Sequence, residues 1–394
     1  MKNAVDSAFF CLCNNANGAI CFFIMKQRLL VRSLMFLSCL FCLPGAVLAQ
    51  GQDAVCKVTG AVEEALTLQP SLPADFPVVT KLWKMPTATG EYAGSYEVKG
   101  VRIRDILTRA RVAKKIDDGF NRPLDMYILV INESGKKRLF SYSEIFLGNQ
   151  TDDILLVSQS RYLIPHKHPD LKAFNWKEDT WLSASTKDFA LPPACMGCHD
   201  GKAAPSLSIP HGLMVAAVQD VWPGRFLDNV VEIRVCQVEP QKALSEKPSN
   251  KDNLWSENAE ISFPASKTFS LAELIKSSLP TNKIKDCSFG EGKGFRGIHA
   301  RSGKSLAQIL SPQLFTLPED SFYILVTALD GYRCLISGGE LMLHKNPYNI
   351  MVVDSEDGES LKKGEGKYKI FFQDDFYIDR CIRLVKEIKL VVVN

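Results

Sequence analysis

Apolar positions recur along the chain at two spacings, and these spacings predict its elements. Ile103, Ile106, Leu107 and Ala110 recur at helical spacing and predict a short amphipathic helix after a turn at Gly100. Continuous or alternating apolar runs predict strands, and a second short helix can begin at residues 143–144. The predicted strands cover 127–131, 137–141 and 230–235. Short strands with few short helices are typical of a β-rich α+β domain.

The same pattern occurs twice in the chain. Residues 92–107 align without gaps on residues 295–310, with two glycines and the apolar Ile/Leu positions in common. Further matches follow in the same order: Ser141 and Glu144 on Ser337 and Glu340 within the segments 127–144 and 323–340, then 230–235 on 385–390. A coincidence of apolar patterns is the alternative. The constant order predicts a duplicated domain.

The two halves differ in length in one region. Between aligned positions 127 and 230 the first half carries about 41 more residues than the second. This surplus, at about 161–223, is rich in proline and holds four of the six histidines and three of the five tryptophans. Long irregular loops inside compact domains are usually functional. We therefore predict a first domain at 50–238 with this insertion, a polar, proline-containing linker at 239–266 and a second domain at 267–394.

The N-terminal residues 1–49 contain a pattern typical of a secretory signal. A basic stretch from Met25 to Arg32 precedes a short apolar core at 34–43, and small residues at 47–49 precede Gln50. We expect translation to start at Met25, with an uncleaved anchor as the alternative. The mature chain is then a periplasmic or otherwise exported bacterial protein with no stable membrane span.

The insertion contains Cys195-Met196-Gly197-Cys198-His199, the attachment pattern of c-type haem. Two thiols two residues apart can add to both vinyl groups of one porphyrin, and the histidine that follows can bind iron as an axial ligand. The alternatives are a disulfide of the Cys-x-x-Cys type and half of a zinc site. A zinc site needs a second close Cys/His pair, and none follows. The motif therefore predicts one covalently bound haem c.

The sixth ligand of the iron is sought in the same insertion. His168 and His166 lie between two prolines, which stiffen their backbone, and His211 is the next candidate. Met214 belongs to an apolar run, 213–218, that is predicted to be a core strand. Other residues of the region are weaker candidates for contacts with the haem: Trp176, Trp181 and Trp222 for packing on the porphyrin, and Lys167, Lys172 and Arg225 for its propionates.

Composition and charge add little. The chain has 394 residues, is 46% hydrophobic and 23% charged, and carries a formal charge of +3, so neither nucleic acid binding nor a basic patch is predicted. Seven cysteines remain after signal cleavage. With two in the haem motif, an odd number is left, which means at least one free thiol and at most two disulfides. These five are Cys56, Cys236, Cys287, Cys334 and Cys381.

The repeat resembles the molybdopterin-binding domain of the sulfite oxidase family. The resemblance rests on glycine and apolar patterning over most of the mature chain: 58–68, 100–107, 224–226 and 230–235 in the first half, and 269–274, 303–310, 330–332 and 385–390 in the second. It implies two such domains in tandem with a mixed α/β fold of considerable β content. In that family a cysteine ahead of the glycine–helix element binds molybdenum. The first half has none between Cys56 and Cys195, and the second offers Cys287 without the family's basic neighbourhood.

Three hypotheses follow. The first is an exported monohaem c-type cytochrome, an electron carrier for a redox partner protein such as another cytochrome. The second is a haem-containing, molybdopterin-dependent oxidoreductase of the sulfite oxidase type, which requires a pterin at Cys287 and is therefore less favoured. The third is a partner-binding module without cofactors. A catalytic residue is not assigned in any of them.

Overall fold

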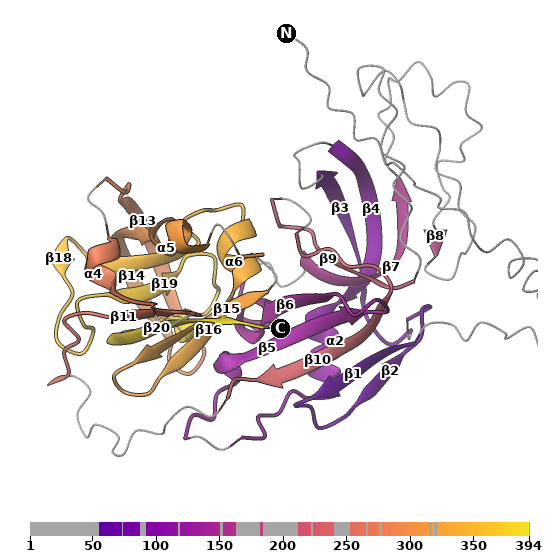
Figure 1. Cartoon of the computed structure of the whole chain (residues 1–394), viewed down its shortest axis with the longest axis horizontal. Helices are drawn as coiled ribbons and strands as arrows, with labels where there is room; N and C mark the ends of the chain where they lie inside the picture. The colour runs from indigo at the N-terminus through magenta and orange to yellow at the C-terminus, as the bar shows by residue number, and fades with distance from the viewer. Residues whose placement is uncertain are drawn as a thin grey trace, which may run out of the picture. The chain divides into compact units, whose positions relative to one another are not determined.

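The computed structural model describes most of the chain from Val55 to Val393, all of it in one compact unit, Asp53–Asn394. The described residues are 55–72, 74–86, 92–116, 119–149, 153–162, 182–183, 212–221, 224–239, 253–264, 267–275, 278–314, 317–318 and 321–393. Figure 1 draws the first half in indigo to pink and the second in orange to yellow.

Each half has one sheet of five strands with the same order (Figure 1). In the first half this order is β2 (Leu66–Leu68), β1 (Cys56–Gly60), β10 (Val230–Gln237), β5 (Met126–Asn132) and β6 (Lys137–Ser141). In the second half it is β12 (Lys267–Ser270), β11 (Glu260–Phe263), β20 (Val385–Val392), β15 (Phe322–Ala328) and β16 (Arg333–Ser337). Only the second and third strands of each sheet run parallel. The described sheets thus repeat an arrangement, not only a sequence pattern.

Each half also has a second sheet, built on a long hairpin. The first half orders it β3 (Val78–Pro86), β4 (Tyr92–Arg102), β7 (Ile154–Tyr162) and β8 (Leu182–Ser183), with β9 (Met214–Ala217) also paired to β7. The second half orders it β13 (Asn282–Gly290), β14 (Gly294–Ser305), β17 (Ile350–Glu356) and β18 (Glu359–Ser360), with β19 (Lys369–Phe372) also paired to β17. β9 and β19 therefore occupy equivalent positions.

The helices are short, and α2 and α3 of the first half occupy the positions that α5 and α6 occupy in the second. The described ones are α2 (Ile103–Ala110), α3 (Tyr142–Phe146), α4 (Leu271–Leu274), α5 (Leu306–Leu314), α6 (Gly338–Leu343) and the 3-10 turns Pro123–Asp125 and Ile378–Arg380. α2 buries the four apolar residues whose spacing predicts it and ends at Arg111, whose φ is +52°. Ser141 precedes α3 as its N-cap, and its side chain and that of Glu144 form a reciprocal capping box. The helix at 103–110 and the strands at 127–131, 137–141 and 230–235 are confirmed within a few residues.

The described residues form five buried apolar clusters, of which three show how the halves are built and joined. One lies in the first half around α2, a second lies in the second half around α5, and each is enclosed by the two sheets of its half. A third joins the halves: Leu129 and Leu139 of the first meet Leu325 and Leu335 of the second. Within it the rings of Tyr127 and Tyr323 stack with centroids 5.2 Å apart. The five-stranded sheets β2–β1–β10–β5–β6 and β12–β11–β20–β15–β16 thus pack on each other through equivalent residues.

The predicted fold class, an α+β tandem of sulfite-oxidase-like domains, is wrong. The structure is 50% strand and 16% helix, with four small sheets in a β-propeller arrangement. The long hairpins β3–β4 and β13–β14 account for much of the difference. They mix polar with apolar residues, so an analysis that looks for apolar runs does not find them.

Two smaller expectations also change. The predicted linker 239–266 contains β11, which pairs in parallel with β20 and belongs to the second half. Gly100 and its counterpart Gly303 do not form turns before the helices. Both lie in strands at β-bulges, and a Cβ there would lie 2.3 Å from the carbonyl oxygen of Leu156 or Val352.

Candidate functional site

The residues predicted to hold the haem lie outside the described residues. They are Cys195, Cys198 and His199 of the motif, the distal candidates His166, His168 and His211, and the packing candidates Trp176, Trp181 and Trp222. Lys167 and Lys172 also lie there. Met214 is described. It is 6% exposed in β9, as its assignment to a core strand predicts.

The strands β7 and β9 mark where the predicted insertion begins and ends in the sequence of the first half. β7 ends at Tyr162, β9 begins at Met214, and the two are antiparallel neighbours with Ile154 opposite Ala217. In the second half the equivalent neighbours β17 and β19 are joined by the short segment 357–368. The surplus of the first half thus falls in one connection between paired strands, and the haem motif belongs to that connection.

Cys287, the molybdenum ligand of the alternative hypothesis, lies on β13 with its side chain exposed. Its cross-strand partner on β14 is Ile298, which is 59% exposed. Cofactor sites are concave and enclose most of their ligand, whereas this thiol stands on the open face of a hairpin. The surroundings of Cys287 therefore do not fit a molybdopterin. The five cysteines that the structure describes are all free, so neither of the two disulfides that their number permits is present among them.

Arg225, considered above for the haem propionates, is instead buried within the protein, with 1% of its surface exposed. Its guanidinium donates to both carboxylate oxygens of Asp220, at 2.8 and 2.7 Å, and to Glu144 at 2.6 Å. The group also lies over the ring of Phe140, 4.7 Å from the centroid. These contacts occupy the guanidinium, so Arg225 is a structural residue and the prediction that it contacts the haem propionates is wrong.

The second half repeats this cluster. Arg380, 2% exposed, donates to both carboxylate oxygens of Asp375 and lies 2.6 Å from Glu340. It covers the ring of Phe372 at 3.9 Å, as Arg225 covers Phe140. We call the six residues Asp220, Arg225, Glu144, Asp375, Arg380 and Glu340 the buried ion cluster. Fork-shaped pairing with a carboxylate is the strongest geometry open to arginine.

Two serines join the halves of the buried ion cluster. Ser337 donates from its hydroxyl to Glu144 at 2.7 Å, and Ser141 donates to Glu340 at 3.2 Å. Each serine also caps the helix that begins beside it by accepting from a backbone N–H, of Glu340 and Glu144 respectively. The exchange ties α3 of the first half to α6 of the second.

Burial and charge shift the pKa values of this cluster in opposite directions. Burial raises the pKa of Glu144, the neighbouring Arg225 opposes that shift, and the negative charge of Glu340 adds to it. Burial likewise raises the pKa of Asp220 and of Asp375. For Arg225, burial lowers the pKa, but Asp220 and Glu144 more than compensate and hold it above its usual value. The guanidinium therefore stays charged while the carboxyls bear the cost of burial.

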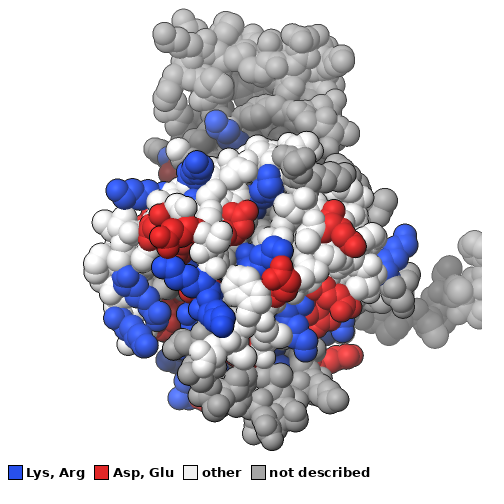
Figure 2. Space-filling view, turned by 90° about the vertical axis from the view of Figure 1, so that its left-hand side faces the viewer, with Lys and Arg blue, Asp and Glu red and all other residues white. Residues whose placement is uncertain are grey.

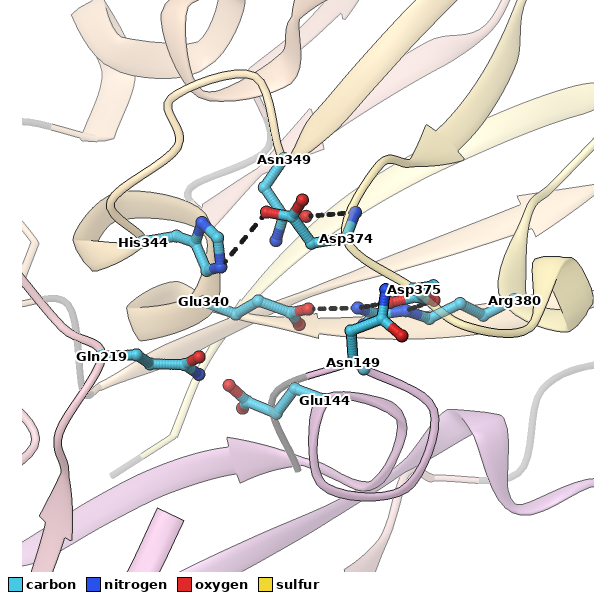
Figure 3. Close-up of a pocket in the computed structure, with 10 residues that line it drawn as sticks. Glu144, Asn149, Gln219, Glu340, His344, Asn349, Asp374, Asp375 and Arg380 are labelled. Atoms are coloured by element: carbon cyan, nitrogen blue, oxygen red, sulfur yellow. Dashed lines mark hydrogen bonds and ion pairs between the residues drawn. The ribbon is translucent and has the colours of Figure 1, made fainter. Parts of the chain in front are cut away.

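A small cavity of about 20 Å³ opens beside the cluster, and Figure 3 shows the side chains that line it. The amide of Gln219 points into it between Glu340 and Glu144. The Oε1 of Gln219 and the Nη1 of Arg380 have no protein partner. A space of this size suits one water molecule. The cavity is lined by side chains of both halves, among them Glu144 and Gln219 of the first and Glu340 and Arg380 of the second.

A second polar group lies on the β14–β17 side of the second half. His299 Nδ1 is 3.0 Å from Asp357 Oδ2 and 3.5 Å from Glu356 Oε1, close enough for the three residues to share a cation. Glu356 is already paired with Arg301 and Lys369, and Asp357 accepts from the backbone N–H of Ala300. The group is therefore saturated by protein contacts.

The outer surface carries charges of both signs. Figure 2 shows the face on the left of Figure 1, where groups of Lys and Arg lie beside groups of Asp and Glu. Exposed pairs such as Lys362–Glu359 and Lys367–Glu257 belong to the second half. Among the described residues the structure has no helix long and apolar enough to cross a membrane.

Sequence reasoning did not find the buried ion cluster, although one signal was present. The repeat aligns Ser141 and Glu144 on Ser337 and Glu340. Polar identities retained within an otherwise apolar pattern indicate a shared polar contact. The partners Arg225 and Arg380 lie far away in sequence and give no local sign of burial.

Comparison with known proteins yields little. No family model matches the chain, and no curated protein matches it. Among solved structures, the chain is similar to the crystal structure of the sulfane dehydrogenase SoxCD from Paracoccus pantotrophus, at 13% identity and a TM-score of 0.28. The similarity covers 83% of this chain and 64% of that one, so this chain spans less than two thirds of its length. A similarity of this strength supports no assignment of fold or function.

Proposed function

We propose that this chain is an exported monohaem c-type cytochrome that carries single electrons. The observation that carries the proposal is the sequence Cys195-Met196-Gly197-Cys198-His199. The N-terminal export pattern supports it, because c-type haem is attached on the outer side of the bacterial inner membrane. The periplasm or another exported location, and a redox protein as partner, belong to the same proposal.

The donor set of the motif fits a haem by its chemistry. Cys195 and Cys198 supply the two thiols, and His199 supplies an imidazole next to them. When bound, the haem supplies a one-electron couple between ferrous and ferric iron. Cys195 and Cys198 would hold that group, and His199 would supply a nitrogen ligand to its iron. His168 and His166, then His211, are the candidates for the other axial side.

The place of the motif in the chain is consistent with an insertion on a folded scaffold. The connection that carries it joins β7 to β9, and the equivalent connection in the second half is short. The apolar cluster of the first half is built from residues that precede the insertion in sequence, including those of α2, and from residues that follow it. The two halves then serve as scaffold and as the surface that a redox partner would meet.

The molybdopterin alternative is not favoured, because Cys287 lies on an open hairpin face. An electron carrier needs no substrate cavity, whereas an oxidoreductase does. If the mature chain contains no haem, the partner-binding module without a cofactor becomes the favoured hypothesis.

The test is the haem content of the mature chain, produced in a host with the cytochrome c maturation machinery. We expect about one iron per chain, no molybdenum, and covalent haem absorbance that survives denaturation. The double variant Cys195→Ala/Cys198→Ala should lose that absorbance. Cys287→Ala is the matched control and should retain it. Unchanged absorbance in the double variant would exclude the motif as the attachment site, and molybdenum that disappears in Cys287→Ala would restore the alternative.

A second set of variants identifies the distal iron ligand independently of the covalent attachment of the haem. His168→Ala, His166→Ala and His211→Ala should each keep the covalent haem. We expect one of them to convert a low-spin spectrum into a high-spin spectrum, because loss of a strong axial ligand weakens the ligand field. Three unchanged spectra would place the sixth ligand elsewhere in the chain.

A further inference from the structure

The hairpin β13–β14 presents one continuous outer face. Register places Cys287 opposite Ile298 and Phe289 opposite Phe295, so these four side chains point to the same side. The side chain of Ser288, between Cys287 and Phe289, points to the other side, where it is 1% exposed and accepts from Arg301. The hairpin therefore has an inner face that packs on the second half and an outer face that is exposed except at Phe289, whose ring meets Phe376 and Tyr377.

The outer face is unusually apolar. Phe295 is 63% exposed, Ile298 59% and Phe289 36%. Phe376, 53% exposed, extends the group, since its ring centroid lies 5.8 Å from that of Phe289. We call Phe289, Phe295, Ile298 and Phe376 the hairpin apolar patch. Scattered exposed apolar residues are normal, but a contiguous patch of large ones marks an interaction site.

Cations flank the hairpin apolar patch. Lys283 and Lys285 lie on the same outer face of β13, opposite Ser302 and Ala300, and both are exposed. Lys293 and Arg296 are exposed at the end of the hairpin, where Glu291 is the one exposed acid of the turn. Asp286, the remaining acid of β13, faces the inner side and pairs with Arg301 at 3.2 Å. The outer face is thus aromatic at its tip and basic along its length.

A second copy of the chain is a poor occupant for this face. β13 is an edge strand, but its lysines and the β-bulge between Ser288 and Phe289 oppose edge-to-edge pairing. A stable protein interface takes roughly 20–30 residues on each side. The four side chains of the hairpin apolar patch provide far less, whereas a few aromatic side chains with neighbouring lysines suffice at a lipid surface.

We propose that the hairpin apolar patch inserts into the interface of a membrane with anionic lipids. Phe295, Ile298 and Phe289 bury their apolar surface at the level of the headgroups. Lys283, Lys285 and Arg296 lie against the lipid phosphates. The contact is peripheral and reversible, because it consists of a few side chains and no spanning segment. It does not depend on the haem, so its failure and the failure of the proposed function can be told apart.

The test is sedimentation of the purified whole chain with lipid vesicles. Vesicles of equal parts phosphatidylcholine and phosphatidylglycerol should bind the chain, and pure phosphatidylcholine vesicles should bind it much more weakly. The variant Phe295→Ser/Ile298→Ser should lower the partition coefficient at least about tenfold, since two large apolar side chains are lost. Lys283→Glu/Lys285→Glu should lower binding to the anionic vesicles. Added salt should weaken the binding of the wild type.

Leu82→Ser is the matched control, because Leu82 is 71% exposed on β3, outside the patch, and should bind as the wild type does. Three results would overturn the proposal: a wild type that does not sediment with anionic vesicles, a double apolar variant that binds equally well, or equal binding to both kinds of vesicle. Light scattering measures the oligomeric state and so tests whether a second copy of the chain occupies the patch instead. A dimer that Phe295→Ser/Ile298→Ser abolishes, in a chain that binds no vesicles, would make the patch an interface between copies.

Discussion

The hydroxyl of Ser337, in the second half, donates a 2.7 Å hydrogen bond to the carboxylate of Glu144, in the first. Glu144 is 6% exposed and is also bound by Arg225. The contact therefore couples the cap of one helix to the ion pair of the other half. Because Ser141 and Glu340 repeat it in the opposite direction, the two halves are joined by an exchange of equivalent groups.

Arg225→Met should destabilise the protein by about 3–5 kcal/mol, because it leaves the buried carboxylates of Asp220 and Glu144 without a counter-ion. Urea unfolding followed by circular dichroism measures the loss. The deficit should shrink as the pH is lowered, since protonation removes the uncompensated charges.

Arg234→Met is the control for that change. Arg234 pairs with Glu232 at 2.7 Å, but its side chain is 47% exposed. Its loss should cost less than about 1 kcal/mol. Equal effects of the two variants would mean that Arg225 is as well hydrated as a surface residue.

Gly100→Ala and Gly303→Ala should each destabilise the protein by at least about 2 kcal/mol, because the new methyl group meets a backbone carbonyl that cannot move independently. The Cβ would lie 2.3 Å from the oxygen of Leu156 in one case and of Val352 in the other. Thermal unfolding of both variants should show similar losses, as the equivalent bulges require.

Gly292→Ala is the matched control for the glycine variants. A Cβ there meets nothing within 4 Å, so its stability should stay within about 0.5 kcal/mol of the wild type. A neutral Gly100→Ala would show that β4 and β7 stand further apart than the structure has them.

The reactivity of the thiols should follow their burial. Burial raises the pKa of Cys56 and of Cys334 to about 12, and that of Cys381 to about 11, so these thiols stay protonated, and Cys56 and Cys334 are also buried from solvent. Cys287 is exposed and should react first with iodoacetamide in the native protein. Mass spectrometry of the labelled peptides measures the order. Rapid native labelling of Cys334 would contradict its burial between the halves.

Local patterns predicted local elements well. The spacing of Ile103, Ile106 and Leu107 gives α2, because a helix with one buried face leaves that period in the sequence. The apolar run at 127–131 gives β5 for a similar reason, since most of its residues are buried. These predictions needed no knowledge of distant residues.

The prediction of the fold class failed for strands with only one buried face and for residues whose contacts lie far away in the sequence. β13 alternates exposed lysines with half-buried residues and contains no apolar run, so nothing local identified it as a long strand. Gly100 was assigned to a turn because glycine is typical of turns, whereas here a neighbouring strand approaches it closely. Arg225 was considered for the haem propionates, because its pairing with Glu144, 81 positions away, leaves no sign in the local sequence. Pairings of this kind cannot be read from one segment.

His299 should titrate above the usual range of histidine, because its hydrogen bond to Asp357 raises its pKa. Conversely, the backbone N–H of Ala300 and then His299 lower the pKa of Asp357. The imidazolium contributes stability that is complete below the unfolded value of about 6.5 and is lost as the pH rises through the raised value. The carboxylate contributes stability that is present above about 3.8 and is lost as the pH falls through the lowered value. The pair is therefore at full strength between about pH 4 and 6.5.

The measurement is an NMR titration of the His299 ring protons in the wild type and in Asp357→Asn. We expect the pKa of His299 to fall in the variant, because the amide keeps the size of the carboxylate but not its charge. His344 reports on the specificity of the change, since its carboxylate neighbour is Asp374 at 3.6 Å and Asp357 is not among its contacts. An unchanged His299 titration would mean that Glu356, 3.5 Å away, and not Asp357, sets the charge of the ring.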